Sequence, residues 1–181
     1  MTRLTVEPTE EAAALAATRR VVAALIEARA QRGRADLGLA GGTTPRLAYR
    51  MLDDHLEDWN GIHLWFCDDR AVGPEAPDSN YAMVAETLLA AAPIPAEQVH
   101  RVLGELGADA AAAAYREELA VLAPDPGSQP VLDLALLGMG PDGHTASLFP
   151  HHPALEATES CVAVHDAPKP PPDRVTLTVP C

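Results

Sequence analysis

The chain has 181 residues, 48% of them hydrophobic, and a formal net charge of −13 at pH 7. This length and composition predict one ordered globular domain, and no apolar run is long enough to cross a membrane. The negative charge argues against nucleic acid or an anionic membrane as a partner. The three cysteines are an odd number without metal-ligand spacing, which is typical of a protein of the reducing cytoplasm.

Helical and strand-like segments alternate along the whole chain. Apolar spacing predicts helices at residues 9–32, from Pro45 onward, at 80–91 and at 108–122. Strands are predicted at residues 35–40, 62–67, 99–102, 131–137, 161–164 and 174–179. This alternation predicts an α/β fold, a three-layer α/β/α sandwich around a mostly parallel, modified Rossmann-like sheet.

The sequence Gly41-Gly42-Thr43-Thr44-Pro45 lies between the first strand and the second helix. Paired glycines let a backbone approach a ligand closely. Free amides at a helix N-terminus, with two hydroxyls nearby, favour a phosphate. Thr44 is expected to cap this helix, with Pro45 at its first position. The loop lacks the lysine of a Walker A loop and the spacing of a dinucleotide fingerprint, so a plain turn and helix cap is the alternative.

The strand at 62–67 leads into Asp68-Asp69-Arg70. Two carboxylates and an arginine at the carboxyl end of a strand can hold sugar hydroxyls or tune a neighbouring base, and the arginine can neutralise a developing oxyanion. A solvated charged turn is the alternative. The sequence Asp78-Ser79-Asn80, which follows shortly afterwards, is interpreted as a helix cap.

The most informative segment is residues 138–150, with the sequence GMGPDGHTASLFP. It follows the 131–137 run, which is predicted to be a fully buried strand. Its glycines and proline force tight turns and place Asp142 and His144 where open α/β sheets bind their ligands. An imidazole beside a carboxylate there suits a general base. In isolation, an Asp-x-His sequence would indicate a turn with a solvated histidine, but the glycines and the preceding strand favour the catalytic interpretation.

A proline-rich segment, residues 167–172, is predicted to be a stiff loop. Lys169 and Arg174 flank its prolines and could reach a phosphate or carboxylate, with a plain surface loop as the alternative. No set of histidine, cysteine and carboxylate side chains has the spacing of a zinc site. Neither a metal nor a cofactor is therefore expected.

The order of these four motifs, from about Leu4 to Val179, resembles the glucosamine-6-phosphate isomerase/6-phosphogluconolactonase family. The most specific part is the segment 138–150, together with the Asp-Asp-Arg turn and the Pro-Lys-Pro-Pro-Pro-x-Arg-x-Thr sequence. Arg70 and the residues 145–150 are similar to the lactonases of this family. Its deaminases typically have an aromatic residue in place of Arg70 and a different sequence after the histidine.

The resemblance implies hydrolysis of 6-phospho-D-glucono-1,5-lactone to 6-phospho-D-gluconate, a step of the oxidative pentose phosphate pathway. A lactone is an activated ester, so a water deprotonated by one base suffices. His144 is the expected base, and Asp142 or Asp68 would orient its ring. Arg70 would stabilise the oxyanion or the product carboxylate. The phosphate is expected to bind residues of two loops: Gly41, Gly42, Thr43, Thr44, Lys169 and Arg174.

Two alternatives stay open. An isomerase resembling glucosamine-6-phosphate deaminase would abstract a proton at carbon, most simply with Asp68, and Arg70 argues against it. A non-catalytic sugar-phosphate sensor would carry a basic helix-turn-helix, which the acidic helix at 9–32 does not provide.

Lactonases of this family normally continue for several dozen residues past the position of Val179. Residues 1–181 are therefore expected to be one sugar-phosphate lactonase domain that lacks its C-terminal elements. The strand at 174–179 would then leave neighbouring apolar surface uncovered. On this expectation the 181-residue chain would be poorly soluble and largely inactive.

Overall fold

The computed structural model describes residues 4–181. One parallel sheet has the strand order β4-β2-β1-β5, and a second, antiparallel sheet has the order β3-β7-β6. The strands are β1 (Ala35–Leu39), β2 (Ile62–Phe66), β3 (Asp68–Arg70), β4 (Val99–His100), β5 (Leu134–Ala135), β6 (Cys161–Val164) and β7 (Arg174–Leu177). The helices are α1 (Glu10–Arg32), α2 (Thr43–Leu52), α3 (Asn80–Val84) and α4 (Ala108–Leu119). Shorter turns are the 3-10 segments Asp53–His55, Ala96–Gln98, Gly104–Leu106, Ala120–Leu122 and Pro153–Glu156, and the π-helical Ala85–Leu89.

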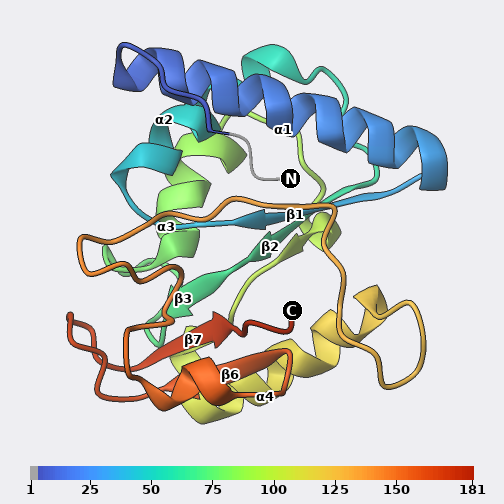
Figure 1. The fold of residues 1–181 in the computed structure, drawn as a ribbon. Helices are drawn as coiled ribbons and strands as arrows, with labels where there is room; N and C mark the ends of the chain where they lie inside the picture. The colour runs from blue at the N-terminus through green and yellow to red at the C-terminus, as the bar shows by residue number, and fades with distance from the viewer. Residues whose placement is uncertain (1–3) are drawn as a thin grey trace.

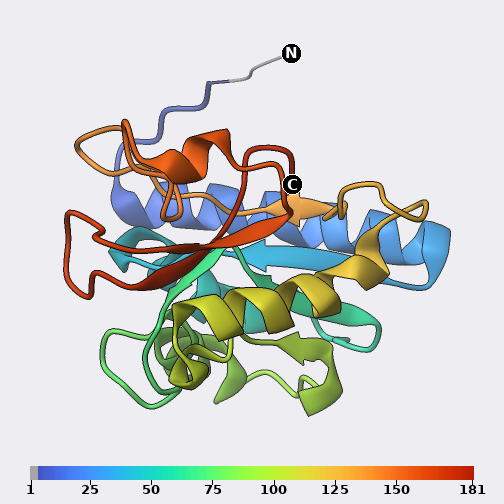
Figure 2. The ribbon, with the colours of Figure 1, turned by 90° about the horizontal axis from the view of Figure 1, so that it is seen from below.

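The predicted α/β class is confirmed. Helices α1 and α2 lie above the parallel sheet in Figure 1, and α4 lies below it. Helix α4 packs against β6 and β7 (Figure 2). The second sheet was not predicted, because the apolar pattern of a strand does not reveal the direction in which it pairs. No helix within residues 4–181 is both long and apolar enough to span a membrane.

Helix α1 begins and ends where its sequence predicts. The Thr9 hydroxyl accepts a hydrogen bond from the amide of Ala12 at 3.1 Å, and Glu10 lies in the first turn, where the helix dipole favours a carboxylate. Gly33 ends the helix with a φ of +73°, a left-handed conformation that glycine adopts at little cost.

Helix α2 begins at Thr43, two residues before the predicted start at Pro45. The prediction that Thr44 caps it is wrong. The capping position is Gly42, and no side chain bonds to the first turn. Gly42 has a φ of +102°, which lets the chain turn from β1 into the helix without a capping side chain.

The prediction of a fully buried strand at 131–137 is also wrong. Only Leu134 and Ala135 pair, and both pair with β1. Val131 is 60% exposed and Leu137 57% exposed. Among the described residues, β5 is an edge strand, so one side of this apolar run has no neighbouring strand to cover it.

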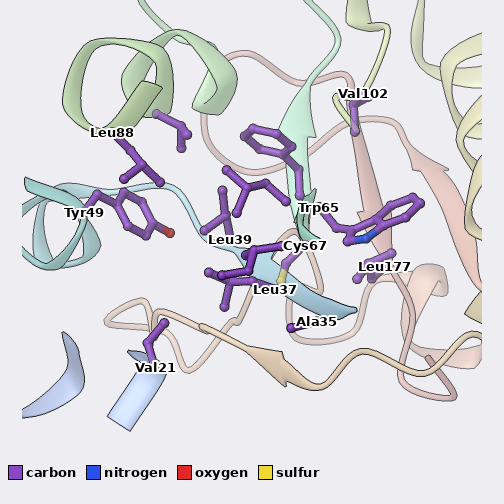
Figure 3. Packing of buried hydrophobic residues seen from close by; sticks show 14 of the residues in the cluster. Val21, Ala35, Leu37, Leu39, Tyr49, Trp65, Cys67, Leu88, Val102 and Leu177 are labelled. Atoms are coloured by element: carbon purple, nitrogen blue, oxygen red, sulfur yellow. The ribbon is translucent and has the colours of Figure 1, made fainter. Parts of the chain in front are cut away.

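The main hydrophobic core surrounds β1 and β2. All five residues of β1 are buried, as expected for a central strand that is covered on both faces. Figure 3 shows Leu37 and Leu39 of β1 packed between Tyr49 of α2 and Trp65 of β2. This core fixes the ends of β1 and β2, from which two of the predicted motifs extend.

Candidate active site

The structure brings the four predicted motifs to one open cleft of about 410 Å³. The cleft lies beyond the carboxyl ends of the parallel strands, where α/β sheets bind their ligands. Of the ten predicted site residues, nine line it: Gly41, Gly42, Thr43, Thr44, Asp68, Arg70, His144, Lys169 and Arg174. The tenth, Asp142, reaches it through a hydrogen bond to His144.

Two buried tyrosines hold the strand ends that lead into the cleft. The Tyr49 hydroxyl donates to the carbonyl of Ala40 at 2.8 Å and accepts from the Ala40 amide at 2.9 Å, just before the glycine loop. The Tyr115 hydroxyl does the same with the backbone of Phe66, just before Asp68. Burial raises the pKa of both phenols, so both remain protonated donors. Sequence reasoning missed them because neither tyrosine belongs to a recognisable motif, and their bonds to the strand ends form only in the folded chain.

The glycine loop presents backbone rather than side chains to the cleft. Because no side chain caps α2, the amides of Thr43 and Thr44 in its first turn have no side-chain partner among the described residues. A Cβ atom at Gly41 would collide with the side chain of Asn80, so only glycine fits there. The loop therefore has the form of an anion-binding helix N-terminus.

Asp68 and Asp69 have different environments. Asp68 is 6% exposed, and its carboxylate accepts hydrogen bonds from Ser147 Oγ at 2.7 Å and from Asn80 Nδ2 at 3.1 Å. Asp69 instead accepts from the amides of Asn80 and Tyr81 at the start of α3. Asp69 thus stabilises the helix, and only Asp68 lines the cleft.

Arg70 is anchored at one nitrogen of its guanidinium group. Nη1 donates to the carbonyl of Asp78 at 2.9 Å and to Asn80 Oδ1 at 2.5 Å. Its Nε atom is buried and has no hydrogen-bond partner among the residues that the structure describes. The guanidinium lines the cleft, where donors not used by Asp78 and Asn80 can serve an anionic group of a ligand.

His144 and Asp142 form a pair across the Gly143 turn, where φ is +85°. Their Nδ1 and Oδ1 atoms are 2.5 Å apart, and the hydrogen bond from His144 lowers the pKa of Asp142. Asp142, and not Asp68, is therefore the carboxylate that orients the ring. A Cβ at Gly140 would collide with the imidazole, which explains a second glycine of this segment. With the proton on Nδ1, the Nε2 lone pair is free to accept a proton.

The proline loop is held by Arg174, which is only 4% exposed. Its Nε donates to the carbonyl of Pro171 at 3.1 Å and its Nη2 to that of Lys169 at 2.9 Å. The guanidinium lies over the ring of Phe149, whose own ring centroid is 4.6 Å from that of His144. Lys169 Nζ is 3.9 Å from Asp142 Oδ1. Arg174 thus supports the loop that brings Lys169 to the cleft.

No group of three or more histidine, cysteine, aspartate or glutamate side chains is arranged to hold a metal ion within residues 4–181. The functional groups of the cleft are the His144 imidazole, the Asp68 carboxylate, two guanidinium groups, the Lys169 ammonium and backbone amides. Together they can bind an anion and activate a water beside an electrophilic carbon.

Comparison with known proteins defines the class. Residues 8–181 match the family described as glucosamine-6-phosphate isomerases/6-phosphogluconolactonase. The chain belongs to this family of α/β proteins.

Within the family, its relatives include lactonases. The 6-phosphogluconolactonase of Mycobacterium tuberculosis is 41% identical in an alignment that covers 96% of this chain and 73% of that protein. The human 6-phosphogluconolactonase is 43% identical over 82% of this chain and 60% of its own length. The crystal structure of 6-phosphogluconolactonase from Thermotoga maritima is similar with a TM-score of 0.82 and 30% identity, covering 91% of this chain and 72% of that one.

Proposed function

We propose that this protein hydrolyses 6-phospho-D-glucono-1,5-lactone to 6-phospho-D-gluconate. The observation that carries the proposal is the His144–Asp142 pair in the same cleft as the glycine loop and Arg70. A base, an oxyanion partner and a phosphate cradle are the groups that this reaction needs. The lactonase names of relatives from bacteria, plants and mammals support it.

The reaction begins with a water positioned at the lactone carbonyl carbon. His144 Nε2 takes a proton from this water while its oxygen bonds to the carbon, and the carbonyl π electrons move to oxygen. Asp142 stabilises the imidazolium that forms. Arg70 donates to the resulting oxyanion.

The intermediate then collapses as the carbonyl reforms and the bond to the ring oxygen breaks. His144 returns the proton to that oxygen, which becomes the 5-hydroxyl of the product. The attacked carbonyl carbon becomes a carboxylic acid group, which then loses its proton to water. No covalent enzyme intermediate is required, because a lactone is already an activated ester.

The 6-phosphate binds to the amides of Thr43 and Thr44 at the start of α2, and Lys169, which lines the same cleft, supplies a cation. Asp68, already held by Ser147 and Asn80, accepts a hydrogen bond from a sugar hydroxyl. The net charge of −13 favours such a small ligand over nucleic acid. Three free cysteines fit the cytoplasmic location that the sequence predicts.

The test is a lactonase assay of the purified chain and of His144→Gln, corrected for spontaneous hydrolysis. The variant is expected to lose about 10²- to 10⁴-fold in kcat, the range of a general base. Its circular dichroism and its affinity for 6-phosphogluconate serve as controls for folding and for the phosphate site. A folded variant with the full rate would refute the assignment. Glucosamine 6-phosphate, offered to the same preparation, tests the isomerase alternative.

A further inference from the structure

Asn80 is a buried side chain at the edge of the cleft, only 2% exposed. It is the first residue of α3, and its place after Ser79 makes it look like part of a helix cap. Other groups start this helix, however. The Ser79 hydroxyl accepts from the amide of Ala82 at 3.2 Å, and the Asp69 carboxylate accepts from the amides of Asn80 and Tyr81. The side chain of Asn80 is therefore not needed to begin α3.

Its side-chain amide instead connects two charged residues that line the cleft. Nδ2 donates to the carbonyl of Asp68 at 2.8 Å and to its Oδ1 at 3.1 Å. Oδ1 accepts from Nη1 of Arg70 at 2.5 Å. A carboxamide can do both at once because it has a donor and an acceptor in one rigid plane.

Asp68 and Arg70 both bond to Asn80 and not to each other. The two residues are two apart on β3, so their side chains leave the same face of the strand. A guanidinium and a carboxylate on the same face of a strand can form an ion pair, and Arg–carboxylate pairs are frequently bidentate. Within the described residues no ion pair joins them, and Asn80 lies between their charged groups.

The same side chain also contacts the glycine loop. A Cβ at Gly41 would collide with the carboxamide of Asn80, so the backbone of the loop packs directly against this group. One neutral side chain thus touches the loop, the carboxylate and the guanidinium.

We propose that Asn80 is a positioning residue of the cleft: it separates Arg70 from Asp68, so that the guanidinium remains available to an anionic group of the ligand. This inference rests on the proposed lactonase function. Without Asn80, Arg70 is expected to pair with Asp68, and its charge is withdrawn from the oxyanion.

Two variants and a matched control test this role. Asn80→Ala removes both contacts and is expected to lower kcat about 10- to 100-fold, with a smaller change in KM, because the oxyanion loses most. Asn80→Asp keeps an acceptor for Arg70 but adds a second carboxylate beside Asp68. Its rate is expected to be low wherever His144 is unprotonated and able to act as the base, because the added carboxylate pairs with Arg70 and withdraws its charge from the oxyanion.

Ser79→Ala is the control, because it weakens the start of the same helix without touching the cleft. It is expected to lower the melting temperature while kcat and KM stay within about twofold of the unsubstituted protein. If Asn80→Ala lowers stability but leaves kcat and the pH profile like those of the control, the residue is merely structural and the proposal is overturned.

A crystal structure of Asn80→Ala separates this proposal from the proposed function. The expected result is an Arg70 guanidinium in direct contact with the Asp68 carboxylate. A guanidinium that stays in place overturns the positioning role, whatever the protein hydrolyses. A protein without lactonase activity, whose Arg70 nevertheless moves in the variant, refutes the proposed function and supports the positioning role.

Discussion

The Asp142 carboxylate determines which nitrogen of His144 can act. It accepts the Nδ1 proton at 2.5 Å, and Nε2 is then the only nitrogen with a lone pair. Because the hydrogen bond from His144 lowers the pKa of Asp142, this carboxylate stays ionised as the pH falls through the range in which a free aspartate is protonated. The stabilisation of the loop by this pair is thus present above that range and is lost only at still lower pH.

Asp142→Asn is expected to lower kcat about 10²- to 10⁴-fold while KM changes little. The asparagine amide can donate to Nδ1, which favours the tautomer with its proton on Nε2 and removes the base. Steady-state kinetics of the lactonase reaction measure both constants. A variant with normal kcat would show that tautomer control does not matter for this reaction.

Gly42→Val is expected to weaken the binding of 6-phosphogluconate by more than about tenfold. The φ of +102° at this position is one that a β-branched residue avoids, at a cost of about 1–3 kcal/mol, so the amides of the α2 start would move. Calorimetric titration measures the affinity. Arg19→Ala, which removes a cation on the exposed face of α1, is the control. If both changes weaken binding equally, bulk charge rather than the backbone amides holds the phosphate.

Part of the candidate site was predictable from individual residues of the sequence. His144 and Asp142 stood out because glycines and a proline surround them, and such residues mark a loop with a special backbone. Asn80 did not, because an asparagine after a serine at a helix start is the ordinary pattern of a cap. Its contacts with Asp68, Arg70 and Gly41 exist only in the folded chain.

At the level of elements, the end of β2 depends on α4. The last pair between β2 and β4 joins Trp65 to His100, so Phe66, which still pairs with Leu39 of β1, extends beyond β4 on its other side. The Tyr115 hydroxyl replaces the missing strand partner, bonding the Phe66 amide at 2.7 Å and its carbonyl at 3.1 Å. Helix α4 thereby holds the strand that leads to Asp68.

Tyr115→Phe is expected to lower the free energy of unfolding by about 1–3 kcal/mol, because it leaves a buried amide and a buried carbonyl without this partner. Urea denaturation measures the change. Tyr81→Phe, which alters a tyrosine that is only partly buried, is the matched control. An unchanged midpoint for Tyr115→Phe would mean that these backbone groups find other partners.

His165 joins three elements on the surface. It follows β6, and its ring contacts Asp173 just before β7 at 2.7 Å and Asp109 in the first turn of α4 at 3.3 Å. The hydrogen bonds to Asp173 and then Asp109 raise the pKa of His165. The protonated ring is favoured in the folded state, so its contribution is complete below the unfolded pKa and is lost as the pH rises through the raised value.

His165→Gln is therefore expected to reduce stability by about 0.2–1 kcal/mol at pH 5.5, a small effect because the contacts are exposed. At pH 9 the variant and the unsubstituted protein should unfold at the same urea concentration. Denaturation curves at the two pH values provide the comparison. An equal difference at both would show that the effect comes from packing, not from charge.

Most elements were predictable from the sequence, and their pairing was less so. The caps of α1 and the buried strand β1 follow from local chemistry. The direction of β7, antiparallel to β3 and β6, is decided by contacts between residues far apart in the chain. The exposure of Val131 and Leu137 likewise depends on which strands flank β5, and an apolar run alone does not reveal that.

For the whole molecule, the net charge of −13 opposes the approach of a phosphorylated ligand. Attraction acts only inside the cleft, where Arg70, Lys169 and the amides of the α2 start face a bound anion. The two effects have different ranges. Repulsion by the whole protein extends over many ångströms, and a Debye length of about 8–10 Å at physiological ionic strength screens most of it. Contacts at hydrogen-bond distance are screened much less.

The rate of productive encounter should therefore increase with salt. Between about 10 mM and 150 mM KCl, kcat/KM for the phosphorylated lactone is expected to rise about twofold, while kcat stays constant because the bound state is little affected. Glucono-1,5-lactone without a phosphate, if it is hydrolysed, should show no such rise. A fall in kcat/KM over the same range would mean that the cations of the cleft steer the substrate from a distance. The local positive field would then outweigh the acidic surface, contrary to what the charge of the chain predicts.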